Sequence, residues 1–409
     1  MNCYWQVPLN SLIAPWQEGV DWARSVEFGG SDALRIPSDH VLLSLAFCGD
    51  YVCCGAADHT IRIWDRESLQ SRATMSGHRG PVTALAAWGK WLISGSTDGS
   101  LVAWCVTAGR AVHTWRAAHR DAIRDLATSY GDSDNGLLIS VCDRGAVLLW
   151  HLGSVAAEPS TWRCVKQLVG HSCSASAVQF LSGDSCLRAA TASEDNDVRI
   201  WDIDADAFTE PSPDSTDCGS EISDDPAVCV ACLDCRSSVC SLAWGDGLLF
   251  TASEDRSIRA WAEAGAVSFA IDAAMNLAVT KKWTCVHKLR LSGSELLLRP
   301  WRIALCAGRI LVSAIGEPPA ARRELLVMGP PLPGRSDEAD ATAGPGNAAT
   351  GALDTEAVVA AAAAAAAAMG SVAWRLPQAA GATVSVLREG AAGEVWAAVG
   401  RHMIVWGRG

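Results

Sequence analysis

The residues that could do chemistry fall into two groups. The first group combines His, Ser or Thr, and Asp, which are the side chains of a hydrolytic triad. The clearest copies are His78 with Ser94 and Asp98, and His171 with Thr191 and Asp195. A single active site would not recur in this way, whereas buried polar groups must be satisfied wherever they occur. We therefore expect structural hydrogen-bond networks, and we predict that the chain is not an enzyme.

The second group is a set of cysteines with C-x-x-C-x-x-C spacing. Cys229, Cys232 and Cys235 are followed by Cys240 five residues later. Three or four thiolates could coordinate zinc in a tetrahedron, so a structural metal site stays open as an alternative. No second pair of ligands follows at the spacing of a zinc finger. We expect buried or solvent-facing thiols at these positions, and we predict no cofactor and no metal.

Composition limits the remaining function classes. The chain has 409 residues, of which 49% are apolar, and its net charge is −12. This composition is too apolar for a disordered chain, and the length favours two domains or a repeat architecture. Because nucleic-acid binders are basic, direct nucleic-acid binding is disfavoured. The acidity is local, since residues 202–235 hold ten acidic residues and no Lys or Arg.

The cysteines and the N-terminus favour an intracellular protein. The sixteen cysteines are scattered along the chain, and the first twenty residues do not read as a secretory signal. Reduced, buried thiols are then the simplest expectation. No apolar run approaches the ~20 residues of a membrane span. Glycine-rich phosphate loops and the G-x-S-x-G motif are absent from the sequence.

One pattern recurs along the chain, and it organises all the candidate residues. An apolar segment, a Gly turn, a second apolar segment and a Ser/Thr-Asp turn lead into a strand that ends in Trp. The Trp-ended copies finish at Trp64, Trp104, Trp150, Trp201, Trp261 and Trp406. A degenerate copy between Trp301 and Met328 makes seven. Gly-His dipeptides or their relatives precede several copies, at Gly77–His78, Ala118–His119 and Gly170–His171.

This combination resembles the WD-repeat family over about residues 30–409. Two copies carry a literal Trp-Asp pair, Trp64–Asp65 and Trp201–Asp202. The resemblance implies an all-β, seven-bladed β-propeller. The chain ends three residues after Trp406, so the last copy lacks its outermost strand. We predict that a segment near Asp32–Ile36 supplies this strand and closes the ring, because an open ring would leave sheet edges uncovered.

The resemblance also implies a role for the recurrent polar residues. In WD repeats, a network within each blade joins the loop before the blade to the turn inside it. The residues assigned to it here are His78, Ser94, Asp98, Trp104, His119, Ser140, Trp150, His171, Thr191, Asp195, Trp201, Thr251, Asp255 and Trp261. In the third copy Arg144 stands where Asp is expected, and in the fifth copy Cys235 stands where His is expected.

Charged residues next to these positions form a candidate partner site. Arg79, Arg120 and Arg236 each follow the His or Cys position, in loops that should face one rim of the ring. The residues beside the Asp turns should share that rim; they include Glu194, Glu254 and Arg256. The guanidinium fork of Arg suits carboxylates and phosphates. The rim could therefore bind an acidic or phosphorylated segment, the alternative being ordinary solvated loop charges.

The predicted domain plan has an N-terminal arm, residues 1–30, and one propeller, residues 31–409. The copies end near residues 65, 105, 151, 202, 262, 328 and 407. Three inserts interrupt them: an acidic one at 204–226, one at 263–281, and a Gly/Pro/Ala tract at 329–371. We expect the inserts to form loops.

The resemblance implies a non-enzymatic scaffold whose partners are proteins of a multi-subunit complex, in the cytoplasm or the nucleus. One alternative is a substrate-recognition subunit of a ubiquitin ligase that reads acidic or phosphorylated motifs. Ligase receptors of this family often carry Trp-Asp-x-Arg, whereas here Arg66 lies one position early. A second alternative is an accessory subunit of an RNA-modifying or RNA-processing complex. Neither a small-molecule substrate nor a membrane is expected.

Overall fold

The computed structural model describes twelve segments of the chain: residues 34–129, 136–181, 187–204, 227–245, 247–271, 277–291, 298–306, 309–316, 323–328, 372–376, 384–390 and 394–406. The predicted arm at 1–30, nearly all of the acidic insert and the whole 329–371 tract lie outside these residues.

The described residues form seven four-stranded antiparallel sheets. The first sheet contains β2 (Leu42–Cys48), β3 (Tyr51–Ala56), β4 (Thr60–Asp65) and β5 (Ser71–Ser76). The second contains β6 (Val82–Trp88), β7 (Trp91–Ser96), β8 (Leu101–Cys105) and β9 (Arg110–Trp115). The third contains β10 (Ile123–Thr128), β11 (Gly136–Cys142), β12 (Val147–Gly153) and β13 (Arg163–Leu168). A 3-10 turn, η1 (Pro159–Thr161), precedes β13.

The remaining sheets follow the same order. The fourth contains β14 (Ala175–Leu181), β15 (Leu187–Ser193), β16 (Asp197–Ile203) and β17 (Ala227–Asp234). The fifth contains β18 (Val239–Gly245), β19 (Leu248–Ser253), β20 (Ser257–Ile271) and β21 (Leu277–Arg290). The sixth contains β22 (Leu298–Cys306), β23 (Arg309–Gly316), β24 (Arg323–Met328) and β25 (Val372–Leu376). The composite sheet joins β1 (Leu34–Pro37) to β26 (Val384–Glu389), β27 (Val395–Val399) and β28 (His402–Trp406).

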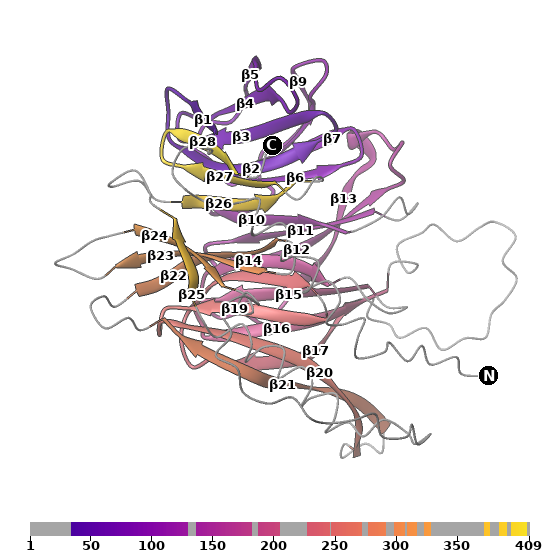
Figure 1. The fold of residues 1–409 in the computed structure, drawn as a ribbon. Coiled ribbons are helices and arrows are strands. Elements are labelled where there is room, and N and C mark those ends of the chain that lie inside the picture. Colours follow the sequence, from indigo (N-terminus) through magenta and orange to yellow (C-terminus); the bar gives the residue numbers. More distant parts are fainter. Residues whose placement is uncertain are drawn as a thin grey trace, which may run out of the picture.

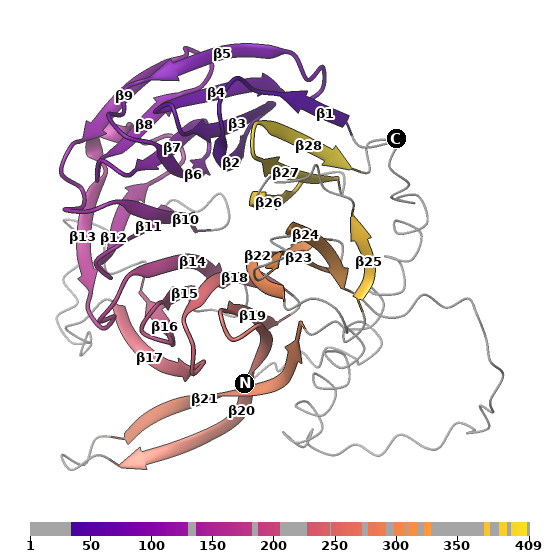
Figure 2. The ribbon, with the colours of Figure 1, turned by 90° about the vertical axis from the view of Figure 1, so that its left-hand side faces the viewer.

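The sheets stand radially in a ring (Figures 1 and 2). The first strands of the sheets line a central channel. Their first strands contact one another in a closed circle, from β2 through β6, β10, β14, β18 and β22 to β26, which returns to β2. Figure 2 shows the ring face-on, with β5, β9, β13 and β17 at its outer edge. The predicted all-β propeller architecture is therefore confirmed.

Burial explains the residue pattern of the strands. The second strand of a sheet packs on both faces against neighbouring sheets, and every residue of β7 and β19 is buried. Such strands hold small residues, such as Ser94, Gly95 and Ser96 in β7, because the facing sheets approach closely. A side chain at Gly95 would meet Ile123 of the third sheet at 2.6 Å. Outer strands such as β5 are mostly exposed and lack this constraint.

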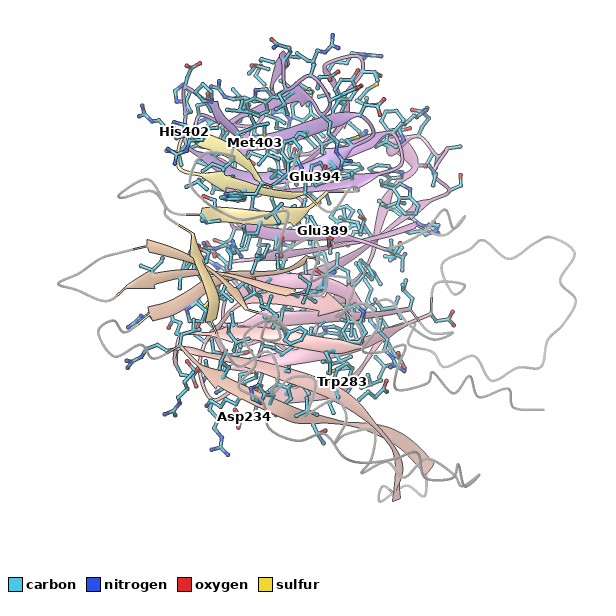
Figure 3. The ribbon with its side chains drawn as sticks, viewed as in Figure 1. Asp234, Trp283, Glu389, Glu394, His402 and Met403 are labelled. Atoms are coloured by element: carbon cyan, nitrogen blue, oxygen red, sulfur yellow. The ribbon has the colours of Figure 1, made fainter. Side chains whose placement is uncertain are left out.

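The two ends of the described chain meet in the composite sheet. β1 pairs with β28, with Leu34 opposite Val405 and Pro37 opposite His402. The prediction that an N-terminal segment supplies the missing outer strand is confirmed, with the strand ending one residue later than the predicted segment. The sulfur of Cys54 contacts that of Met403 at 3.8 Å, so the first and composite sheets also pack together. Figure 3 labels Met403 and its neighbour His402 on β28.

The prediction of a loop at 263–281 is wrong. β20 and β21 continue as a paired hairpin past the end of the repeat, with Glu263 opposite Trp283 and Ile271 opposite Leu277. The insert therefore extends two strands of the fifth sheet outward from the ring (Figure 2). Pairing between the two strands satisfies the backbone N–H and C=O groups that a loop would leave to solvent. No membrane-spanning helix is found among the residues that the structure describes.

Candidate functional site

The polar residues of the second sheet meet as one buried network. His78 precedes β6, and its Nε2 lies 2.6 Å from the Ser94 hydroxyl on β7. The Trp104 indole on β8 donates to the same hydroxyl at 2.7 Å. Asp98 reaches His78 through Ser100, whose hydroxyl lies 2.8 Å from His78 Nδ1 and donates to Asp98 at 2.6 Å. Sequence reasoning missed Ser100, which follows the Asp turn at the start of the next strand.

The fourth sheet builds the network without such an intermediate. His171 Nδ1 lies 3.0 Å from the Asp195 carboxylate, and its Nε2 lies 2.8 Å from the Thr191 hydroxyl. Trp201 donates to Thr191 at 2.9 Å. The backbone N–H of Ser172 also donates to Asp195, at 3.0 Å, which fixes the loop before the sheet to the turn within it. Burial lowers the pKa of His171 below its ordinary value, against the opposing effect of Asp195.

The third sheet carries an incomplete network. His119 Nε2 lies 2.7 Å from Ser140, and Trp150 donates to Ser140 at 2.9 Å. Among the described residues, His119 Nδ1 is buried and has no hydrogen-bond partner. Arg144 occupies the Asp position and instead lies 2.6 Å from Asp121. Burial lowers the pKa of His119 to about 4, so the ring is neutral at pH 7.

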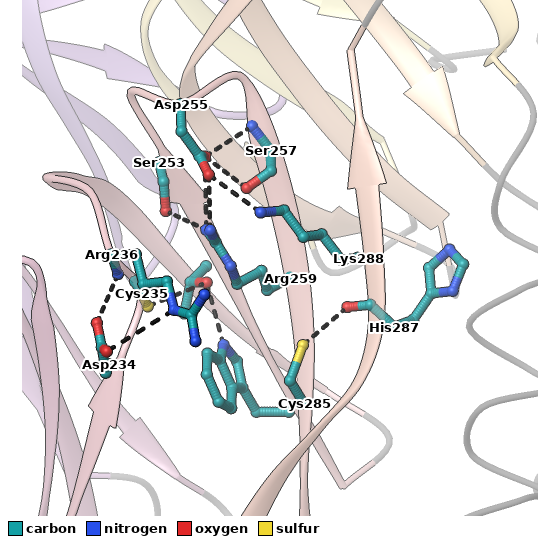
Figure 4. Close-up of polar contacts among 12 residues, drawn as sticks. Asp234, Cys235, Arg236, Ser253, Asp255, Ser257, Arg259, Cys285, His287 and Lys288 are labelled. Carbon is teal, nitrogen blue, oxygen red and sulfur yellow. Dashed lines mark hydrogen bonds and ion pairs between the residues drawn. The ribbon is translucent and has the colours of Figure 1, made fainter.

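In the fifth sheet an arginine supplies the positive partner of the turn Asp (Figure 4). Arg259 donates to Asp255 at 2.6 Å and to Ser253 at 3.0 Å. Trp261 still donates to Thr251, at 3.1 Å. Cys235 replaces the histidine, and its Sγ lies 3.9 Å from the Thr251 hydroxyl. Arg259 on β20 therefore connects its strand to the Asp255 turn. An imidazole at the Cys235 position would otherwise have made this connection.

These networks do not have the accessibility of a hydrolytic site. The hydroxyl-bearing residues Ser94, Ser140, Thr191 and Thr251 are each 0% exposed. Each hydroxyl also accepts an indole N–H from the Trp of its own sheet. A nucleophile must reach its substrate, and these hydroxyls instead link the strands of their own sheet.

The unequal networks predict unequal mutational effects. Asp195→Ala should lower the free energy of unfolding by about 2–3 kcal/mol, because it leaves His171 and the Ser172 N–H without their buried acceptor. Asp143→Ala at the third-sheet turn should lower it by less than about 1 kcal/mol, since Asp143 does not contact His119 and its side chain is 34% exposed. Urea unfolding of the two variants measures the difference, and equal losses would contradict it.

The cysteines do not converge on one site. Cys229 and Cys232 lie on β17, Cys235 lies in the following loop, and Cys240 lies on β18. Cys229 Sγ contacts the Ala231 carbonyl, whereas Cys240 Sγ contacts that of Pro300. Burial raises the pKa of Cys235 and of Cys240 to about 12. In the described part of the chain, no three His, Cys, Asp or Glu side chains are grouped to hold a metal ion.

The predicted rim residues share one side of the ring. In five sheets the turn between the second and third strands donates a backbone hydrogen bond to the loop entering the first strand. These bonds are Ala57 to Val41, Thr97 to Pro81, Asp143 to Ala122, Glu194 to Ser174, and Glu254 to Ser238. Arg79, Arg120, Arg236, Glu194 and Glu254 are exposed, and Arg256 is partly buried. Within the described residues, no carboxylate lies within 4 Å of the Arg79 or Arg120 guanidinium.

A bulge recurs near the start of the first strands, and four of its residues, Leu43, Thr83, Arg124 and Ser385, line the central channel. Each first strand has a register shift near its start, after its first paired residue in six sheets and after its third, Pro300, in the sixth sheet. The residues at the shifts are Leu43, Thr83, Arg124, Ser176, Cys240, Trp301 and Ser385. A bulge re-aims a side chain. Several of them bond the next sheet: Thr83 and Ser176 donate to the carbonyls of Ile123 and Val239.

Comparison with known proteins agrees with this architecture. The family model described as WD domain, G-beta repeat matches residues 34–65, 69–105 and 162–202. Telomerase protein component 1 of Rattus norvegicus is 28% identical over 39% of this chain and 6% of its own length. Nuclear distribution protein nudF 1 of Talaromyces marneffei is 29% identical over 33% of this chain and 28% of its own.

The pre-rRNA-processing protein IPI3 of Yarrowia lipolytica is 30% identical over 38% of this chain and 34% of its own. The matched region thus spans about a third or less of each of these relatives. Each repeat that the family model matches takes the outer strand of one sheet and the first three strands of the next: β1 to β4, β5 to β8 and β13 to β16. The chain therefore contains WD repeats, at least over these matched residues, and its sheets form a β-propeller.

Proposed function

We propose that this chain is a non-enzymatic scaffold of an intracellular multi-subunit complex, with the seven sheets acting as the seven blades of one ring. The observation that carries the proposal is the charged rim. Arg79 and Arg120 are exposed there without a carboxylate partner among the described residues, while buried networks hold their loops. Fixed loops that present free guanidinium groups lose little entropy when they bind an anion.

The rim favours a partner segment that is acidic or phosphorylated. Arg236, in the loop entering the fifth sheet, lies 4.0 Å from Asp234 and is 85% exposed, so it adds a third accessible guanidinium to the rim. Glu194 and Glu254 occupy the loops of the fourth and fifth sheets on the same rim. Complementary charges across an interface mainly set specificity and the association rate. A partner with an acidic stretch beside a basic one would fit this division.

The experiment is affinity purification with mass spectrometry from the native cell. The test variant carries Arg79→Glu, Arg120→Glu and Arg236→Glu. The matched control carries Arg35→Glu, Arg110→Glu and Arg116→Glu, three exposed positions on or beside the outer strands β1 and β9. We expect the rim variant alone to lose one coherent set of partners. Equal retention by both variants, with cooperative melting of each, would overturn the rim assignment.

One relative favours a second candidate, an accessory subunit of an RNA-processing complex, because IPI3 is a pre-rRNA-processing protein. The net charge of −12 and the acidic residues on the rim argue that such a role would proceed through protein partners. Recovery of RNA-processing proteins in the purification would support it. Recovery of ubiquitin-ligase subunits would support substrate recognition for a ligase instead.

A further inference from the structure

The central channel contains a cavity of about 270 Å³ lined by residues of all seven first strands. Most of its lining is apolar or small. Its charged lining residues are Arg124 and Asp125 on β10, Arg302 on β22 and Arg388 on β26. Three guanidinium groups therefore share the channel with one carboxylate. Low-dielectric walls concentrate the field of such an imbalance inside the cavity.

Arg302 is held by carbonyl groups rather than by an acid. Its Nε donates to the Ser385 carbonyl at 3.2 Å, and its Nη1 donates to the Cys240 carbonyl at 3.3 Å. Burial lowers its pKa, although Asp125 acts in the opposite direction. Carbonyl oxygens orient a guanidinium but do not neutralise its charge. These two bonds fix the group in the wall and leave Nη2 with no hydrogen bond to the described residues.

Asp125 does not form an ion pair with these arginines. Its two carboxylate oxygens accept the backbone N–H groups of Leu126 and Val178, at 2.9 and 3.0 Å. Burial raises its pKa, and both Arg302 and Arg388 oppose this effect. Among the described residues, no salt bridge within 4 Å joins Asp125 to a guanidinium. The carboxylate is thus occupied by the main chain.

Arg124 and Arg388 differ in how they are compensated. Arg124 stands at the channel mouth, half exposed, and pairs with Asp143 on the rim. Arg388 is exposed to the cavity, and no carboxylate of the described residues lies within 4 Å of it. Its strand is next to that of Arg302 in the circle of first strands. Two neighbouring strands therefore present two guanidinium groups without an acidic partner.

We propose that the channel binds a phosphate group between Arg302 and Arg388, while Arg124 lies at the channel mouth. The oxygens of a doubly charged phosphate can accept from Nη2 of Arg302 and from the Arg388 guanidinium at once, and its charge matches the two cations. The small volume restricts the ligand to a phosphate group and a few further atoms. The group can belong to a free small phosphate compound or to a phosphorylated side chain inserted into the channel. This site is separate from the exposed rim arginines.

Calorimetry at constant ionic strength tests the site on the full chain. The probes are inorganic phosphate, pyrophosphate, and the peptide Gly-Gly-Ser-Gly-Gly with and without phosphate on its Ser. Acetate serves as the monoanion control. We expect a phosphate probe to bind one site per chain, and Arg388→Gln to weaken that binding at least tenfold. Arg388 is exposed, so Arg388→Gln keeps the fold. Arg302→Gln is the second variant, and its binding is interpreted only if the variant melts cooperatively.

The outcomes separate the two ligand sources. Tighter binding of the phosphopeptide than of phosphate or pyrophosphate assigns the group to a partner segment, and the reverse assigns it to a free small molecule. Both results support the site. No binding of any phosphate probe up to 10 mM overturns the proposal. The proposal is also overturned if Arg388→Gln leaves phosphate binding unchanged while the double variant Arg79→Glu, Arg120→Glu abolishes it. In that case the anion binds on the rim.

Discussion

Replacing Trp104 by Ala is expected to lower the free energy of unfolding by about 3–5 kcal/mol. The indole is 1% exposed and packs among residues of the first and second sheets, including Ile61, Met75 and Leu92. Its removal leaves a cavity between two sheets that surrounding strands cannot close, because backbone pairing fixes their spacing. It also removes the N–H donated to Ser94. Urea unfolding followed by circular dichroism measures the loss.

Two further variants separate packing from hydrogen bonding. Trp104→Phe keeps most of the ring volume but deletes the donor, and we expect a loss of about 1–2 kcal/mol. Trp301→Ala is the control, since that indole is 42% exposed, and it should change stability by less than about 1 kcal/mol. If Trp104→Ala were no more destabilising than Trp301→Ala, the Trp-ended strands would not anchor the contact between sheets.

The ion pair that closes the ring gives the second large effect. Arg66, which follows β4, lies 2.5 Å from Glu394, which directly precedes β27, so the pair joins the first and composite sheets. Glu394 is labelled in Figure 3. The Glu394 side chain is 8% exposed, and the guanidinium also stacks 4.8 Å from the centre of the Phe47 ring. Arg66→Met should lower the free energy of unfolding by about 2–3 kcal/mol, because it leaves a buried carboxylate without its cation. The 23% exposure of Arg66 keeps the loss below that of a fully buried pair.

This pair also predicts a pH dependence. Burial raises the pKa of Glu394, but the hydrogen bond and the charge of Arg66 outweigh it, and the pKa lies below its ordinary value. A carboxylate with a lowered folded-state pKa stabilises the fold above its unfolded pKa of about 4.3 and loses that contribution as pH falls through the folded value. The stability gap between wild type and Glu394→Gln should be full at pH 6 and shrink below pH 4. Glu158→Gln, at an exposed pair, should show no such gap; a constant gap for Glu394→Gln would contradict the assignment.

Much of the candidate site could be predicted because its residues recur at fixed offsets. Trp201, Thr191 and Asp195 occupy the same positions as Trp104, Ser94 and Asp98, and the structure brings each set together. Exceptions within one repeat were harder to interpret. His78 reaches Asp98 through Ser100, and Arg259 compensates for Cys235, because the hydrogen-bond partner depends on which nearby side chain has the right length and direction. Repeat alignment does not contain that information.

The sequence by itself determined the strands, the repeat and the need for a strand to close the ring. These features follow from local rules, since alternation, turn residues and a terminal Trp act over a few positions. The tertiary structure alone decided that the 263–281 segment pairs as a hairpin and that Arg124, Arg302 and Arg388 share one channel. These three arginines come from three sheets, and the residues beside them give no sign of the others. Their meeting depends on ring closure and on the bulge that sets each inner strand, which are properties of the assembled sheets.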